Sequence, residues 1–237
     1  MRDEEGPRLS ELVVIHTGGF ARETVEVVRA VNQQRPTWEL LGFLDDRPEL
    51  ADTWVDGLPV LGPVSELERY GNAHVVVCAG GPQDYFSRRQ VVDRLGLPSE
   101  RYATIVHPAA VVPSSCTVGP GSVLLAGVVT TTKVRVAAHV AVEAGVVLSH
   151  DDVVGSYATL GPGVCLAGTV KIGEGAYVGT GAVIHQERTV GAWPLVGMGA
   201  VVLDDVPPAE VWVGVPARRL RAVDLPADLA APGTSPL

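Results

Sequence analysis

The chain has few cysteines and few basic residues. The first shortage bears on its redox compartment, and the second on the partners that it can bind. Among 237 residues only Cys78, Cys116 and Cys165 are cysteine, and no two of them form a CxxC pair. An odd number of isolated cysteines favours a reducing compartment over a disulfide framework. Lysine and arginine number 18 against 27 aspartates and glutamates, which gives a formal net charge of −9. With no large basic cluster, a nucleic-acid-binding or anionic-membrane-binding surface is disfavoured.

Long hydrophobic runs are missing as well. No apolar stretch approaches the ~20 residues that a membrane-spanning helix needs. The charged opening, residues 1–10, carries no apolar signal segment. Together with the isolated cysteines, these absences predict a soluble, cytoplasmic protein.

A six-residue repeat, by contrast, fills the second half of the chain. From Val106 to Val202 an aliphatic residue returns at every sixth position without an insertion, and only Thr130 breaks the series. Small residues, often glycine, recur just after these positions. A period of six matches neither the 3.6-residue turn of a helix nor the alternation of a strand. It does match short strands joined by tight corners, where small residues let the chain bend.

Three such rungs make one coil of eighteen residues, so that residue n lies beneath residue n + 18. The aliphatic residues then stack inward, in one column for each face of the coil. The sequence therefore predicts a parallel β-helix of about five coils over residues 105–223. Residues 224–237 are rich in proline and alanine, and we expect a flexible tail there. A β-sandwich or a helical domain would not keep so strict a register.

The first 104 residues lack the repeat and alternate between strand and helix patterns. We expect strands at 12–15, 39–44, 58–61 and 74–79, and helices at 20–31, 64–70 and 83–95. This alternation predicts a small parallel sheet flanked by helices, a Rossmann-like α/β domain over residues 1–104.

The turn after the first expected strand is a candidate phosphate site. Gly18, Gly19 and Phe20 open the following helix, where backbone amides can hold a phosphate group. His16 and Thr17 stand where a dinucleotide-binding turn has its first glycine. Two interpretations of His16 are open: it contacts a ligand phosphate, or it replaces a glycine that is no longer needed.

Two acidic residues end the second expected strand. Asp45 and Asp46 stand where an acidic residue can meet a ribose or sugar hydroxyl. The alternative is that the two aspartates only cap a loop. On the first interpretation both belong to a substrate site in the front domain.

Several stretches together resemble a known family. Beside the repeat they are 14–23 (VIHTGGFARE), 41–46 (LGFLDD), 149–151 (SHD), 166–173 (LAGTVKIG) and 214–218 (GVPAR). Over residues 11–222 the chain resembles bacterial hexapeptide-repeat acyltransferases. Within these it is most similar to the sialic-acid O-acetyltransferase and nucleotide-amino-sugar N-acetyltransferase group. The resemblance implies a left-handed β-helix, a homotrimer with active sites at the seams between subunits, and acetyl-CoA lying along the coils.

Acetyl transfer from a thioester needs a base, donors for the developing oxyanion and alignment of both substrates. His150 suits the base because the ordinary pKa of histidine lies near about 6.5. Asp151 is expected to hold the imidazole tautomer and stabilise the charged ring. The eighteen-residue coil places Gly168 directly beneath His150, with its N–H open to a thioester oxygen. The resemblance implies these same roles, although Gly168 could also be no more than a tight corner.

For CoA, the resemblance implies pantetheine against the backbone of successive coils and phosphates near the closing basic residues. Gly173, Gly179 and Gly197 are corner positions that we expect to expose amides. Arg218 and Arg219 are the candidates for the phosphate groups, and a solvated basic end is the alternative. No metal ion is expected.

The favoured function is acetyl-CoA-dependent N-acetylation of an amino sugar, nucleotide-linked because of the front domain. The alternatives are O-acetylation of a sialic acid or another small alcohol, and a non-catalytic scaffold that binds a sugar nucleotide. A zinc site of carbonic-anhydrase type needs three converging histidines. His150 and His185 do not share a column, because they lie 35 residues apart. His139 and His185 are expected at outward corners, as surface residues.

Overall fold

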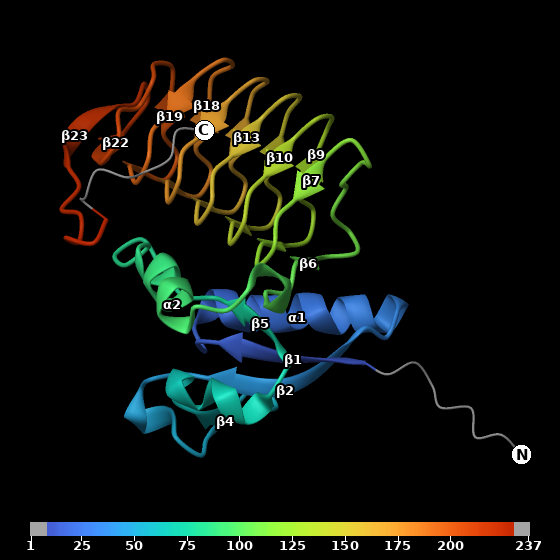
Figure 1. Ribbon diagram of the computed structural model, residues 1–237. Helices are drawn as coiled ribbons and strands as arrows, with labels where there is room; N and C mark the ends of the chain where they lie inside the picture. Colours follow the sequence, from blue (N-terminus) through green and yellow to red (C-terminus); the bar gives the residue numbers. More distant parts are fainter. Residues whose placement is uncertain (1–8, 230–237) are drawn as a thin grey trace, which may run out of the picture.

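The computed structural model describes residues 9–229, which form a front domain and a stack of coils above it (Figure 1). The elements of the front domain are β1 (Ser10–Ile15), α1 (Gly19–Gln34), β2 (Trp38–Leu44), η1 (Pro48–Leu50), β3 (Trp54–Val55), β4 (Leu58–Gly62), η2 (Val64–Tyr70), β5 (His74–Val77), α2 (Ser87–Leu95) and η3 (Ser99–Arg101). Its sheet has the order β3-β4-β2-β1-β5 and is parallel except for the β3–β4 hairpin. The predicted parallel sheet with flanking helices is therefore confirmed. The segment 64–70 is a 3₁₀ helix, and α2 begins four residues later than expected.

The second part is a three-sided coil. Its domain-facing sheet comprises β6 (Ile105–Val106), β8 (Val123–Leu124), β11 (Ala141–Val142), β14 (Thr159–Leu160), β17 (Tyr177–Val178), β20 (Leu195–Val196), β22 (Glu210–Val213) and β23 (Arg218–Ala222). The second sheet comprises β9 (Val129–Thr130), β12 (Val147–Leu148), β15 (Cys165–Leu166), β18 (Val183–Ile184) and β21 (Val201–Val202). The third comprises β7 (Thr117–Val118), β10 (Arg135–Val136), β13 (Val153–Val154), β16 (Lys171–Ile172) and β19 (Thr189–Val190).

The register of these sheets follows the predicted eighteen-residue coil. Val136 pairs with both Val118 and Val154, and Leu148 pairs with Leu166. The repeated aliphatic side chains point inward and form one continuous core, in which Leu148 is fully buried. Each buried valine, leucine or isoleucine of this kind contributes about 1.5–3 kcal/mol to stability. The fold is therefore held by a repeating hydrophobic column in each face.

The outward-facing residues differ between the three sheets. In the second sheet they form what we call the outer valine face, which comprises Val129, Val147, Cys165, Val183 and Val201. Val183 is 42% exposed. On the third sheet the corresponding residues are mostly polar: Thr117, Arg135, Val153, Lys171 and Thr189. An uncovered apolar face is thus confined to one side of the coil.

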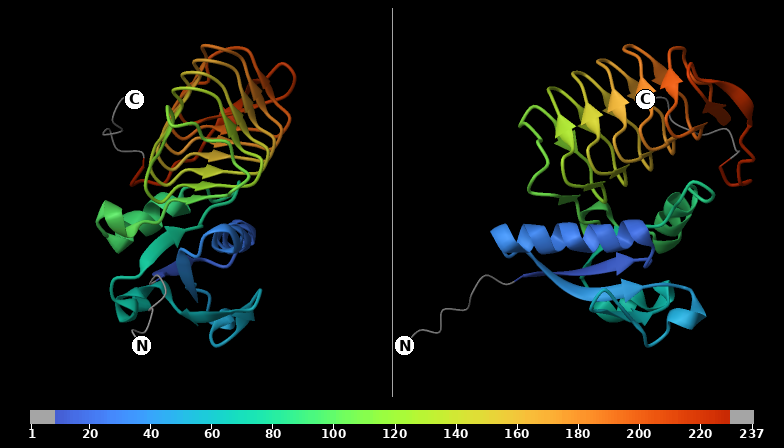
Figure 2. Two further views of the ribbon diagram at one scale, coloured as in Figure 1. Left: turned by 90° about the vertical axis from the view of Figure 1, so that its right-hand side faces the viewer. Right: turned by 180° about the vertical axis from the view of Figure 1, so that it is seen from behind.

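The front domain packs against the domain-facing sheet, with α1 and α2 between that sheet and the strands of the front domain (Figures 1 and 2). Val25 and Val28 of α1 share a core cluster with Ile105 and Val123. Arg88 of α2 is 3% exposed and donates to groups of the coil. No helix within residues 9–229 has the length and apolar character needed to cross a membrane.

The expected flexible tail needs correction for its first six residues. Leu229 is 8% exposed and packs with Tyr85 and Trp193 at the domain interface. Asp228 accepts a hydrogen bond from Gln90 of α2 at 3.3 Å. Proline-rich composition did not reveal these contacts, because Tyr85 and Gln90 lie more than a hundred residues away in the sequence. Residues 230–237 of the predicted tail lie outside the described residues.

Candidate active site

Each corner of the coil contains four residues between two strands, and their backbone groups follow one pattern. At the corner after β12, the N–H of Asp151, the third residue, donates to the Thr132 carbonyl of the preceding coil at 3.0 Å. The third residue lies in the left-handed region, with φ 61° at Asp151. Within residues 9–229, the N–H of the second corner residue meets no backbone or side-chain acceptor. Pro120 and Pro162 interrupt this series on two edges, whereas the edge that carries His150 has a free N–H at every second position.

His150 and Gly168 occupy this second position in successive coils. An ideal Cβ added to Gly168 would lie 2.2 Å from Nε2 of His150, so the ring lies directly across the glycine. Second positions run from residue 120 to 204 in steps of six, and Gly168 is the only glycine among them. The φ of Gly168 is not positive, so the corner itself does not require glycine. A side chain at this position would meet the ring of His150, so the glycine leaves room for that ring.

Asp151 pairs with His150 as the sequence predicted. Its Oδ2 lies 3.0 Å from Nδ1 of the ring, within hydrogen-bond distance. The two side chains are 60% and 50% exposed. In the tautomer that donates Nδ1–H to the carboxylate, Nε2 keeps its lone pair free on the side of Gly168. This arrangement places an imidazole nitrogen beside an open peptide N–H.

Asp152, which the sequence analysis did not single out, shapes the same corner from within. It is fully buried and accepts hydrogen bonds from the N–H groups of Ser149 at 2.7 Å and Val170 at 2.8 Å. The Ser149 hydroxyl donates to the Leu166 carbonyl. At the equivalent corner of the next coil, the Ala167 N–H instead donates along the coil to Ile184. Burial raises the pKa of Asp152 to about 7, against the opposing effect of its two N–H donors. In the sequence, Asp152 could have been found as a carboxylate at a corner position that faces into the coil.

The three predicted CoA-binding glycines do not present free amides. Gly173, Gly179 and Gly197 are first corner residues, whose N–H groups still belong to the hydrogen-bond ladder. They donate at 2.7–2.8 Å to the carbonyls of Val190, Val196 and Trp212. A Cβ on Gly173 would lie 2.2 Å from the Gly191 carbonyl oxygen, so close packing of coils explains its small size. The expectation of exposed amides at these positions is wrong, because the free N–H belongs to the next residue along each corner.

Arg218 and Arg219 lie on β23 at the far end of the coil. The guanidinium of Arg219 pairs with Glu210 at 2.7 Å, and that of Arg218 lies 3.5 Å from Asp204. Both arginine side chains are more than half exposed. Asp204 occupies the second corner position two coils beyond Gly168. From His150 the amide column therefore runs through Gly168 to Asp204, beside Arg218.

The predicted phosphate residues come together in a pocket of the front domain. Gly18, Gly19 and Phe20 line it with His16 and Arg47, and its opposite wall is the segment 78–81. His16 has a left-handed backbone, with φ 76°, where a glycine would be unstrained. Burial lowers the pKa of His16. The pocket thus combines the first amides of α1 with a guanidinium.

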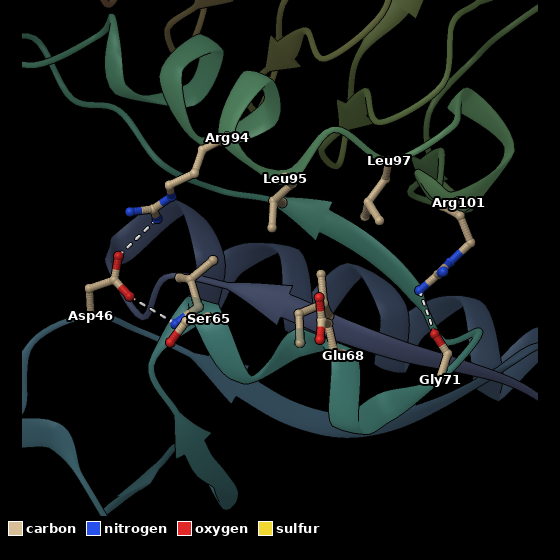
Figure 3. Close-up of a pocket in the computed structure, with 10 residues that line it drawn as sticks. Asp46, Ser65, Glu68, Gly71, Arg94, Leu95, Leu97 and Arg101 are labelled. Atoms are coloured by element: carbon tan, nitrogen blue, oxygen red, sulfur yellow. Dashed lines mark hydrogen bonds and ion pairs between the residues drawn. The ribbon is translucent and has the colours of Figure 1, made fainter.

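Asp45 and Asp46 contact different groups. Asp45 is 4% exposed and accepts hydrogen bonds from Thr17 and Arg47. Burial would raise the pKa of Asp45, but these hydrogen bonds outweigh burial and hold the pKa below its usual range. Asp46 instead lines another pocket, where it accepts from the Val64 N–H and pairs with Arg94 (Figure 3). Asp45 and Asp46 therefore belong to different hydrogen-bond networks, and Asp46 ties the turn after β2 to the start of η2.

His139, predicted at the surface, is buried at the domain interface. Its ring stacks on Tyr157 at 5.2 Å and meets the edge of Tyr102. Burial lowers the pKa of His139 to about 4. His185 is exposed as expected. Within the described residues, no three histidine, cysteine or carboxylate side chains gather as a metal ion requires.

Comparison with known proteins places this geometry in a family. The PglD N-terminal domain model matches residues 11–95. UDP-N-acetylbacillosamine N-acetyltransferase of Bacillus subtilis is 31% identical over 121 residues, 50% of this chain and 52% of that protein. The acetyltransferase domain of PglB from Neisseria gonorrhoeae, solved with acetyl coenzyme A, is 30% identical with a TM-score of 0.80, covering 90% of this chain and 100% of that one. The chain belongs to the hexapeptide-repeat nucleotide-amino-sugar N-acetyltransferases.

A second solved member of these N-acetyltransferases is similar over the same extent. A variant of perosamine N-acetyltransferase from Caulobacter crescentus, in complex with CoA and GDP-perosamine, is 30% identical with a TM-score of 0.79, covering 90% of this chain and 98% of that one. The likeness spans both parts of the molecule. The predicted fold, a Rossmann-like domain followed by a left-handed parallel β-helix, is therefore confirmed, as is the predicted acyltransferase family.

Proposed function

We propose that the protein transfers the acetyl group of acetyl-CoA to the amine of a nucleotide-linked amino sugar. The observation that carries this proposal is the His150 ring, paired with Asp151 at 3.0 Å and lying across Gly168. These residues supply a base and an open N–H at one point of the coil. The solved relatives that match both domains are an N-acetyltransferase with CoA and GDP-perosamine and an acetyltransferase domain with acetyl coenzyme A.

In the proposed reaction, the acceptor amine attacks the thioester carbonyl while Nε2 of His150 takes the amine's proton. Asp151 keeps the Nδ1–H tautomer and stabilises the imidazolium that forms. The N–H of Gly168 donates to the oxyanion of the tetrahedral intermediate. Collapse of that intermediate expels the CoA thiolate, which recovers the proton from His150. The amide product and free CoA thiol leave, and the histidine is neutral again.

The path for CoA follows the amide column of the His150 corner. Coils lie about 4.8 Å apart, so Asp204 and its neighbour Arg218 stand roughly 10 Å beyond Gly168. Arg218 and Arg219, both more than half exposed, remain our candidates for the CoA phosphates. The free amides of the second corner residues replace Gly173, Gly179 and Gly197 as candidates for the pantetheine contacts.

We further propose a homotrimer in the cytoplasm. The corner of His150 joins the second and third sheets, whereas the front domain covers the remaining one. A substrate held by the front domain of one chain is thus separated from its own His150 by the width of the coil. The outer valine face borders the His150 corner and supports a subunit seam there. All three cysteines are free, which fits a reducing compartment.

A charge on the outer valine face is expected to break the trimer. Val183→Glu places a carboxylate in the proposed seam, where burial of an unpaired charge is strongly unfavourable. Multi-angle light scattering should give three chains per particle for the unmodified protein and one for the variant. Acetylation should fall at least tenfold with it. Glu100→Lys, an exposed charge change on the front domain, is the control; a trimeric Val183→Glu variant would exclude this seam.

The proposed reaction is tested by thiol release from acetyl-CoA over a panel of acceptors. Nucleotide-linked amino sugars should support release, and mass spectrometry should find one acetyl group on the sugar nitrogen. Free amino sugars and sialic acid serve as comparison acceptors. Release only with a hydroxyl acceptor would establish O-acetylation instead, and release with none would refute the proposal.

A further inference from the structure

The carboxylate of Asp45 has no capacity left for a ligand. Its Oδ2 accepts from the N–H and hydroxyl of Thr17, at 2.9 and 3.0 Å, and from Nη2 of Arg47 at 2.9 Å. Its Oδ1 accepts from the backbone N–H and Nε of Arg47, at 3.1 and 2.9 Å. Five donors thus share a group with about four lone-pair sites. The side chain of Asp45 is 1% exposed.

This position is where an acidic residue of a Rossmann-like domain hydrogen-bonds the ribose 2′-hydroxyl. A ligand hydroxyl could bind Asp45 only by displacing Arg47 or Thr17. Displacing Arg47 would break a bidentate ion pair, which is among the stronger interactions in proteins. The pocket therefore lacks the group that usually detects the 2′-hydroxyl.

Positive charge surrounds the same pocket. The side chain of Arg47 is 51% exposed even while it pairs with Asp45, so part of its guanidinium faces the pocket. Behind the wall formed by Phe20 and Gly80 lies Arg88, whose guanidinium is 5.7 Å from the Phe20 ring centre. An ideal Cβ on Gly80 would lie 3.8 Å from Nη2 of Arg88.

Arg88 is a buried cation that forms no ion pair within the described residues, and Glu143 is the carboxylate whose charge acts on it from nearby. It donates only to uncharged groups, the carbonyls of His139 and Ala158 and the hydroxyl of Thr159. Its buried Nε has no partner within the described residues. Burial lowers the pKa of Arg88 to about 10, which leaves it charged at neutral pH. An anion in the adjacent pocket would compensate this charge, and the amides that open α1 face the same space.

We propose that Arg47 determines the specificity of the front pocket: it withholds Asp45 from the nucleotide and offers its guanidinium to the diphosphate. The pocket then selects for two phosphates and not for the 2′-hydroxyl. The acceptor class consequently includes amino sugars linked to 2′-deoxyribonucleoside diphosphates as well as ribonucleoside diphosphates. This inference rests on the proposed function only in assuming that an amino sugar is attached to the nucleotide. Nucleotide binding to the pocket can be measured without turnover.

The test is calorimetric titration of the unmodified, full-length protein with UDP, 2′-deoxy-UDP and UMP, without acetyl-CoA. The dissociation constants of UDP and 2′-deoxy-UDP should agree within twofold, and that of UMP should be at least tenfold higher. Binding of 2′-deoxy-UDP ten times weaker than UDP would overturn the proposal, because Asp45 would then have been released to the ribose. Equal binding of UMP and UDP would also overturn it, since the diphosphate would not be the group that is recognised.

Two variants examine Arg47 itself. Arg47→Ala should weaken UDP binding at least tenfold and flatten its salt dependence, and should make 2′-deoxy-UDP bind more weakly than UDP because Asp45 becomes accessible. A merely structural Arg47 would not produce that new ribose preference. Arg22→Ala removes an exposed arginine of α1 that pairs with Asp56, outside the pocket, and should leave both constants unchanged.

The proposed function and this inference fail separately. Equal binding of UDP and 2′-deoxy-UDP without any acetylation would refute only the function. Acetylation of a ribonucleotide-linked amino sugar, combined with tenfold weaker binding of 2′-deoxy-UDP, would refute only the role of Arg47.

Discussion

Replacing His150 by alanine is expected to lower kcat for acetyl transfer by a factor of about 10²–10⁴, the usual contribution of a positioned general base. Nε2 is the free nitrogen of the ring, because Asp151 holds Nδ1 at 3.0 Å. No other histidine lies in the same column, and the ring is 60% exposed, so the fold does not depend on it. Thiol release under saturating acetyl-CoA and acceptor gives kcat. Trimer mass and CoA affinity should be unchanged.

The matched control for this variant is His185→Ala. His185 is an exposed histidine on the same edge of the coil, two coils beyond the His150 corner, and its Nδ1 contacts the carbonyl of Gln186. Its loss should leave kcat within twofold of the unmodified protein. Turnover by the His150→Ala variant within threefold of the unmodified enzyme would remove His150 from the mechanism.

The second large effect is expected from a single methyl group. In Gly168→Ala the new Cβ would lie 2.2 Å from Nε2 of His150, far inside contact distance, so the ring must move away. The methyl group also shields the N–H that is proposed to meet the oxyanion. Loss of one oxyanion donor commonly costs about 10²–10³ in kcat, and we expect a loss of that order. The exposed ring can move into solvent, so the melting temperature should change little.

A double-mutant cycle separates the two effects of Gly168→Ala. In the His150→Ala background there is no ring to displace, so any further loss reports shielding of the N–H alone. Thr180→Ala leaves an alanine at a second corner position on another edge and should be neutral. Full activity of Gly168→Ala would show that neither the ring position nor the amide contributes.

The positions of His150 and Gly168 relative to each other could be predicted from the repeat length alone. Because the coil is eighteen residues long, positions 150 and 168 coincide in every arrangement that keeps the inward column, and the structure brings these residues together. The pairing of Asp151 with His150 needs only adjacent residues at a corner. The prediction of a free N–H at Gly173 was wrong by one residue. A six-residue period does not show which corner residue has an N–H outside the interstrand hydrogen bonds.

The sequence by itself determined the coil, its register and the opposition of His150 to Gly168, since a strict repeat gives each residue the surroundings of the residue eighteen positions away. Only the tertiary structure decided that Asp45 is closed by Arg47 and Thr17, that His139 is buried against Tyr102 and Tyr157, and that Arg88 lies behind the front pocket. Those outcomes depend on contacts between side chains of different elements, and for His139 and Arg88 of different domains. No local period or spacing encodes such contacts, because they arise where two separately patterned surfaces meet.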